Sequence, residues 1–193
     1  MKVLAIDTAT ERCSVALWIH GQVTERVVDT PRGHADLILP MVEEILREAG
    51  VSLRDLDGIA YGRGPGAFTG VRIAIGVVQG LAFGAALPAV GISDLAAVAQ
   101  QVAQPGDRVL VCMDARMNEV YWATFSCDAN SGLVIASSVE RVERPESVQT
   151  QDAINVLAGT GFRAYPKLAS AFHGVVTHDS VLPRLYGDRK SVV

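Results

Sequence analysis

The alternation of apolar and polar residues predicts three short strands at the start of the chain. Residues 2–8 (KVLAIDT) form an almost continuous apolar run that ends in Asp7 and Thr8, the pattern of a strand buried on both faces. Residues 13–21 and 22–29 then alternate apolar and polar side chains on either side of a short turn. Strands joined by such short polar turns predict an antiparallel meander.

Helical spacing appears next in two places. Residues 36–49 place apolar side chains three and four positions apart, which predicts a helix with one buried face. Residues 56–62 predict a strand that leads into a glycine-rich loop, Gly62 to Gly70. We expect a helix over residues 70–86 after this loop, with Thr69 as its N-cap. Two further elements, a strand and a helix, are predicted at residues 87–93 and 94–102.

The helix predicted at residues 70–86 carries glycine at positions i, i+4 and i+8, namely Gly76, Gly80 and Gly84. Each glycine costs about 1 kcal/mol of helix stability relative to alanine, so a stripe of three indicates close approach of another backbone. The flanking residues are apolar nearly all round the helix, which predicts burial on more than one side. Tight packing within its own domain and a subunit interface both remain open.

A membrane span is an alternative for this helix, because GxxxG within an apolar run of about 18 residues is typical of transmembrane dimerisation faces. However, Arg72 and Gln79 interrupt the run, and Pro88 ends it. No basic segment flanks the helix to orient it in a bilayer. We therefore predict that the chain does not enter a membrane.

The pattern restarts after a break at residues 104–107. Residues 108–113 predict a buried strand that ends at Asp114, just as the first strand ends at Asp7. Alternating strands follow, and residues 153–162 predict a strand that runs into a Gly-Thr-Gly turn. An order of elements that occurs twice predicts an α/β protein of two lobes. The predicted lobes are residues 1–104 and 105–193.

Composition adds three constraints. Hydrophobic residues make up 49% of the chain and charged residues 20%, which predicts that a partner covers some apolar surface. The net charge is −4 and no run of Lys or Arg occurs, which argues against a chain that grips RNA by itself. Cys13, Cys112 and Cys127 all lie in apolar segments, so we expect free buried thiols in a reducing compartment. With no evident signal peptide, this predicts a cytoplasmic protein.

Three segments carry a family resemblance. IDTATERCSVAL (residues 6–17), GPGAFTGVRIAIG (64–76) and DARMNEVY (114–121) resemble the TsaB family, also called YeaZ, of bacterial tRNA threonylcarbamoyladenosine biosynthesis proteins. The resemblance extends to about residue 180. It implies two ribonuclease-H-like lobes of the actin/sugar-kinase/Hsp70 superfamily.

The resemblance also implies partners. The family is similar to its catalytic paralogue TsaD, with which it forms a complex joined by the ATPase TsaE. This complex transfers a threonylcarbamoyl group to the adenosine next to the anticodon of tRNA. We therefore expect a non-catalytic scaffold or activating subunit that contacts tRNA only through the complex and forms a homodimer in the absence of its partners. The expected interface residues come from two helices: Leu39, Val42, Leu46, Arg72, Gly76, Gly80 and Gly84.

The sequence departs from the paralogue in two places. The paralogue binds a metal through a His-x-x-x-His pair, whereas here His34 is followed four positions later by Ile38. One histidine opposite an aliphatic side chain cannot share an ion, so no metal site is expected and a metallopeptidase is excluded. The other departure is residues 185–193, which replace the family's closing helices and predict a shortened second lobe.

A nucleotide site is predicted only weakly. The superfamily places phosphate and adenosine contacts at positions that correspond here to Asp7, Thr8, Asp114, Gly159, Thr160 and Gly161. The loop from Gly62 to Gly70 matches neither a Walker A motif nor G-x-G-x-x-G. We therefore interpret the site as vestigial, identify no cofactor of this chain, and place ATP at the level of the complex. The alternative function is a stand-alone small-molecule kinase or ATPase, with Asp7 and Asp114 as Mg²⁺ ligand and base.

Overall fold

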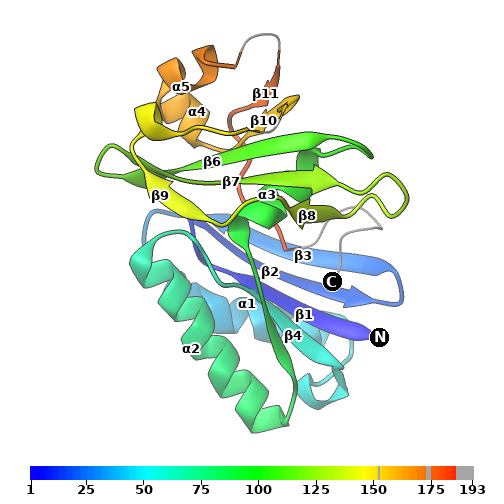
Figure 1. The fold of residues 1–193 in the computed structure, drawn as a ribbon. Coiled ribbons are helices and arrows are strands. Elements are labelled where there is room, and N and C mark those ends of the chain that lie inside the picture. Colours follow the sequence, from blue (N-terminus) through cyan, green and yellow to red (C-terminus); the bar gives the residue numbers. More distant parts are fainter. Residues whose placement is uncertain (152, 173–174, 186–193) are drawn as a thin grey trace. The chain divides into compact units, whose positions relative to one another are not determined.

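The computed structural model describes residues 1–151, 153–172 and 175–185 (Figure 1). The chain divides into two compact units, Met1–Asp94 with the segment that starts at Arg184, and Leu95–Pro183. Each unit is described by itself. The second lobe was predicted to be shortened at residues 185–193. Of these, residues 186–193 lie outside the described part of the chain.

The first unit is built on a five-stranded sheet with the strand order β3-β2-β1-β4-β5. The first three strands form the predicted antiparallel meander, and β4 and β5 run parallel to β1. Leu4 pairs with Leu17 on one side and with Ile59 on the other, which aligns large apolar side chains across the sheet. The strands are β1 (Lys2–Asp7), β2 (Arg12–Ile19), β3 (Gln22–Asp29), β4 (Gly58–Gly62) and β5 (Ala89–Ile92).

Two helices, α1 (His34–Glu48) and α2 (Phe68–Ala85), pack against the first sheet (Figure 1). The predicted helix with one buried face is confirmed, because Val42, Ile45 and Leu46 are buried against the sheet. Leu39 and Ala49, which the same spacing placed on that face, are exposed. The helix begins slightly earlier than predicted and is followed by the 3-10 turn η1 (Leu53–Asp55).

The N-cap predicted for α2 is wrong. The helix begins at Phe68, with Ala67 rather than Thr69 at the N-cap position and no side-chain cap. The Ala67 N–H donates a hydrogen bond to the carbonyl oxygen of Ala9 at 2.7 Å. A tertiary contact with the chain beyond β1 therefore sets the start of this helix, in place of the local side-chain cap that the sequence suggested.

The second unit repeats this arrangement with the strand order β11-β10-β6-β7-β8, and β9 also pairs with β7. An antiparallel β6–β7 hairpin is flanked by the parallel strand β10, as β1–β2 is flanked by β4, so the predicted repeat is confirmed. Residues 133–142 form two short strands instead of the single predicted one. The strands are β6 (Arg108–Arg116), β7 (Glu119–Cys127), β8 (Val134–Ala136), β9 (Arg141–Glu143), β10 (Val156–Ala158) and β11 (Val176–His178).

Helices cover both faces of the second sheet. Alternate residues of β6 join two different apolar clusters, because successive side chains of a strand point to opposite faces. One cluster includes α3 (Asp94–Val102), and the other includes α4 (Gly161–Ala164) and α5 (Pro166–Ser170). Since α3 packs on the second sheet, the unit boundary lies after Asp94 and not after residue 104 as predicted. The remaining 3-10 turn is η2 (Pro145–Ser147).

The three cysteines confirm the prediction of buried cysteines without disulfides. Cys13, Cys112 and Cys127 are all buried, and none of them forms a disulfide within the described residues. Burial raises the pKa of the Cys13 thiol to about 11, so the unreactive protonated form dominates at neutral pH.

Candidate functional site

The glycine-rich loop between β4 and α2 lies directly on the chain that follows β1. A Cβ atom at Gly62 would be 2.7 Å from Asp7 Oδ1, and one at Gly66 would overlap the carbonyl oxygen of Ala9. A Cβ atom at Gly70 would overlap the carbonyl oxygen of Thr8. Close backbone approach therefore requires glycine at Gly66 and Gly70, whereas at Gly62 the side chains of two aspartates leave no room for a Cβ atom.

Thr8 has a structural task in this contact. Its side chain is fully buried, and Oγ1 donates a hydrogen bond to the carbonyl oxygen of Gly70 at 2.7 Å. This bond joins the end of β1 to the first turn of α2. The position of α2 on the sheet thus depends on the loop geometry, while a nucleotide contact by Thr8 stays a prediction.

A buried pair of carboxylic acids lies beside the same loop. Asp7 ends β1 and Asp94 begins α3, and the side chains are 3% and 0% exposed. Oδ1 of each would lie within 2.8 Å of a Cβ atom at Gly62. Asp7 Oδ1 accepts the Ala9 N–H at 2.8 Å, whereas neither Asp94 oxygen has a hydrogen-bond partner among the described residues.

Burial makes both carboxyl groups of this pair harder to ionise. Burial raises the pKa of Asp7, and burial together with the adjacent Asp7 charge raises the pKa of Asp94 well above its usual range. Two carboxyl groups in such a site cannot both carry charge cheaply, so they hold a proton where exposed aspartates are ionised. Sequence reasoning singled out Asp7 and missed Asp94. The available signal was the strand-then-aspartate order, which recurs at residues 92–94.

His34 lies at the start of α1 and is 8% exposed. Its Nε2 atom is buried without a hydrogen-bond partner in the described part of the chain. Ile38, at the second position of the paralogue's histidine pair, is fully buried in the apolar core. Within residues 1–151, 153–172 and 175–185, no group of three or more His, Cys, Asp or Glu side chains is placed to hold a metal ion.

The second unit brings together several of the predicted nucleotide residues. Asp114 lies near the end of β6, and its backbone N–H donates a hydrogen bond to Thr160 Oγ1 at 3.2 Å. Asp114 Oδ1 accepts the Arg116 N–H at 2.9 Å and the Tyr165 hydroxyl at 3.3 Å. Tyr165 was not predicted, because nothing in its local sequence connects it with Asp114.

The Gly-Thr-Gly turn packs against β6. Gly159 has a left-handed φ of +102°, and a Cβ atom there would overlap the carbonyl oxygen of Cys112. A Cβ atom at Gly161 would lie 2.9 Å from the same oxygen. Packing therefore accounts for both glycines, and their role in nucleotide binding stays a prediction.

The glycines farther along α2 differ from those of the loop. A Cβ atom at Gly76, Gly80 or Gly84 would have no atom within 4 Å from the described residues beyond the helix's own backbone, so the whole stripe faces open space. The buried residues of α2 are Gly70, Ala74 and Val78. The expectation that α2 is buried on more than one side is therefore wrong within this chain, because its sheet covers only one side.

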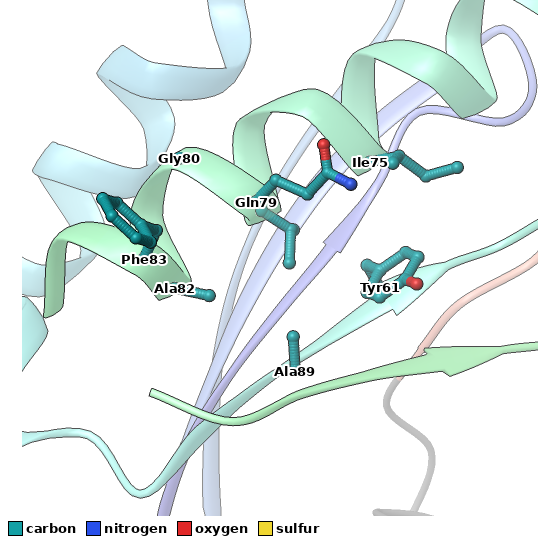
Figure 2. Close-up of a pocket in the computed structure, with 8 residues that line it drawn as sticks. Tyr61, Ile75, Gln79, Gly80, Ala82, Phe83 and Ala89 are labelled. Carbon is teal, nitrogen blue, oxygen red and sulfur yellow. The ribbon is translucent and has the colours of Figure 1, made fainter. Parts of the chain in front are cut away.

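A groove of about 550 Å³ lies between α2 and the strands β4 and β5 (Figure 2). Figure 2 shows that α2 contributes Ile75, Gln79 and Phe83 to this groove, while Tyr61 and Ala89 come from β4 and β5. The Phe83 side chain is 92% exposed, which is unusual for a large aromatic residue. The groove is lined by Tyr61, Ile75, Val78, Gln79, Gly80, Ala82, Phe83 and Ala89.

The remaining residues predicted for the interface divide into two groups. Val42 and Leu46 belong to the apolar core, so their assignment to an interface is wrong. Both point from α1 toward the sheet, whereas Leu39 is 49% exposed. Arg72 is exposed, and its guanidinium carbon lies 3.5 Å from the ring centroid of Phe68, which is also exposed.

Comparison with known proteins identifies the family. The sequence model of TsaD, tRNA N6-adenosine threonylcarbamoyltransferase, matches residues 28–178. The protein named tRNA threonylcarbamoyladenosine biosynthesis protein TsaB from Escherichia coli K12 is 49% identical over 93% of the chain and 79% of its own length. The chain belongs to the TsaB family. The Haemophilus influenzae TsaB protein is also 49% identical, over 64% of the chain and 53% of that protein.

A solved structure supports the same assignment. YeaZ from Pseudomonas aeruginosa superposes with a TM-score of 0.85 at 43% identity, covering 99% of this chain and 89% of that one. The predicted family and the predicted α/β fold of two ribonuclease-H-like lobes are thus confirmed. None of these TsaB relatives carries a name that points to a stand-alone kinase.

In this TsaB family member, α2 has the length and composition of a membrane span. Its mean hydropathy over 18 residues is 1.5, and 17% of that stretch is buried. One such helix is weak evidence, because soluble proteins also contain helices of this composition. The observation that matters for function is that the apolar surface of α2 is exposed.

Proposed function

We propose that this chain is a non-catalytic scaffold or activating subunit that docks a second protein on the exposed face of α2. Membership of the TsaB family assigns the chain to tRNA threonylcarbamoyladenosine biosynthesis. The proposal concerns the role of this chain in that biosynthesis.

The observation that carries the proposal is the open glycine stripe. Gly76, Gly80 and Gly84 each weaken α2 by about 1 kcal/mol relative to alanine, and none of the described residues outside the helix packs against them. A helix backbone from another molecule could approach this stripe closely, because no side chain intervenes. Association would then bury apolar surface that the isolated chain leaves exposed, above all Phe83.

The partner we propose is TsaD or a second copy of this chain. The match to the TsaD model covers residues 28–178 and so includes both α1 and α2. A paralogue with corresponding helices presents a related surface, and a two-fold interface uses one patch twice. A homodimer and a complex with TsaD would therefore compete for the same face of α2, with TsaE joining the assembled complex.

A protein partner fits this face better than a lipid bilayer does. Arg72 and Gln79 both project from the exposed side of α2. The neighbouring helix α1 exposes Glu43 and Glu44, and acidic side chains are costly in the hydrocarbon region. We accordingly propose a cytoplasmic location and no membrane insertion.

Two features support a non-catalytic role. The residue that corresponds to the paralogue's second metal-binding histidine is Ile38, whose side chain lies in the core and cannot be turned toward an ion without opening it. The formal net charge of −4 and the lack of a run of Lys or Arg also argue against a chain that binds tRNA by itself. We propose that tRNA contacts and ATP use belong to the complex as a whole.

The test is Gly80→Leu, assayed by co-purification with tagged TsaD and by size-exclusion chromatography. The added side chain projects into open space, so the variant should remain folded but lose association with TsaD. Ala129→Leu adds similar apolar bulk at an exposed position of the second unit and should associate normally.

Complex formation by Gly80→Leu at the wild-type level would overturn the docking proposal. A threonylcarbamoyl-transfer assay with each subunit omitted in turn tests the non-catalytic role. Turnover by this chain without TsaD would overturn that part independently.

A further inference from the structure

The second unit contains a groove that neither the family assignment nor the proposed docking face accounts for. Its volume is about 730 Å³, which lies in the range of small-molecule sites. Three segments form it: the tip of the β6–β7 hairpin, the chain that follows β9, and the chain from α4 to α5. The lining residues are Met117, Asn118, Arg144, Pro145, Glu146, Val148, Ala164, Tyr165, Pro166, Lys167, Leu168 and Ala171.

The groove has an apolar floor, and the ring of Tyr165 is held in a fixed orientation. Val148 and Leu168 are 8% and 4% exposed and belong to the apolar cluster beneath α4 and α5. Tyr165 packs against this cluster, while its hydroxyl donates a hydrogen bond to Asp114 Oδ1 at 3.3 Å. Contacts at both ends of the side chain orient the ring before any ligand arrives, which reduces the entropy lost on binding.

The groove lining includes two positively charged side chains. Arg144 and Lys167 are exposed, and in the described part of the chain neither side chain has an ion pair or hydrogen bond. Glu146 is the acidic residue of the lining, so the lining carries net positive charge on a chain whose net charge is −4. A guanidinium and an ammonium at one site favour an anionic group, above all a phosphate.

The tip of the β6–β7 hairpin adds a polar group to the groove lining. Arg116, Met117 and Asn118 have φ values of 66°, 52° and 61°, so three consecutive residues other than glycine are left-handed. Two-residue hairpin loops favour positive φ at both central residues, so the turn accounts for Met117 and Asn118. Here the tip places the Asn118 carboxamide, which can both donate and accept hydrogen bonds, in the groove lining.

We infer that this groove binds a mononucleotide. Arg144 and Lys167 hold the phosphate, the Tyr165 ring packs against the base, and the Asn118 carboxamide bonds to its polar edge. The inference is independent of the proposed docking face. It also concerns a different set of residues from the predicted nucleotide contacts, because the groove lining includes none of Asp7, Thr8, Asp114, Gly159, Thr160 and Gly161.

The experiment is an NMR titration of the full ¹⁵N-labelled chain with AMP, with separate titrations of adenosine and inorganic phosphate. AMP should bind saturably, and the shifted amides should cluster at residues 117–118, 144–148 and 164–171. Adenosine and phosphate should each bind at least roughly tenfold more weakly, because each retains only one half of the recognition.

Variants sharpen the test. Arg144→Gln with Lys167→Gln should weaken AMP binding by roughly tenfold or more, whereas Arg47→Gln with Arg54→Gln, a matched loss of two exposed charges in the first unit, should leave it unchanged. Unaltered amide spectra elsewhere in each variant establish that it is folded. Absence of saturable binding, shifts centred on Asp7 and Gly159–Gly161, or unchanged affinity in the double groove variant would each overturn the inference.

Discussion

Two glycine-to-alanine substitutions in the same helix should have opposite effects on stability. Gly70 and Gly76 both lie in α2, so alanine gives a similar gain in helix propensity at each. At Gly76 the new methyl group meets no atom within 4 Å. We therefore expect Gly76→Ala to increase the free energy of unfolding by about 0.5–1 kcal/mol.

At Gly70 the same methyl group would overlap the carbonyl oxygen of Thr8. Forcing the two segments apart costs about 1–3 kcal/mol of packing energy. It also endangers the buried hydrogen bond from Thr8 Oγ1 to the Gly70 carbonyl, which is worth about 1–3 kcal/mol when its partner is lost. After the propensity gain, Gly70→Ala should lower the free energy of unfolding by about 1–5 kcal/mol.

The assay is equilibrium urea unfolding followed by circular dichroism. Dilute protein that size-exclusion chromatography shows to be monomeric is needed, because self-association would add to the apparent stability. Unfolding free energies that shift in the same direction for both variants would refute the division of the glycines into packed and open positions. A Gly76→Ala variant less stable than Gly70→Ala would refute it most directly.

Three further predictions concern the first unit. Because the pKa of Asp94 is raised in the folded state, its contribution to stability is complete below the ordinary aspartate pKa of 3.8 and is lost as pH rises through the folded pKa. Asp94→Asn should flatten this decline and be more stable than wild type at neutral pH, and an unchanged pH profile of unfolding would contradict the buried pair. Leu46→Ala should lower the free energy of unfolding by about 2–5 kcal/mol in thermal or urea unfolding, whereas Leu39→Ala should change it by about 0.5 kcal/mol or less. Similar losses in the two variants would contradict the assignment of Leu46 to the core and Leu39 to the surface. Thr8→Val should lower the free energy of unfolding by about 1–3 kcal/mol and speed hydrogen exchange in the first turn of α2. Unchanged exchange in that turn would argue against the hydrogen bond to Gly70.

The elements of this chain could be predicted from sequence because their signals are local. Period-two alternation identified β2 and β3, period-3.6 spacing identified α1, and the recurring strand-aspartate order identified two similar lobes. The motifs that resemble the TsaB family are also contiguous segments, so no tertiary information was needed to recognise them. Each of these inferences depends on neighbours a few residues apart.

The candidate site was only partly predictable, because its decisive properties depend on residues far apart in the chain. Asp94 becomes notable only when folding buries it beside Asp7, and Tyr165 only when its hydroxyl reaches Asp114. Hydrophobic spacing showed that α1 has an apolar face, but could not show that Leu46 turns inward.

The glycines illustrate the same limit. In sequence, Gly70 ends the glycine-rich loop and Gly76 begins the helical stripe, but neither position shows what packs against it. Folding places Gly70 against the backbone of Thr8 and leaves Gly76 in the open. The sequence determined that this helix would be rich in glycine, whereas only the packing of distant segments decided which glycines the fold itself requires and which remain free for another molecule.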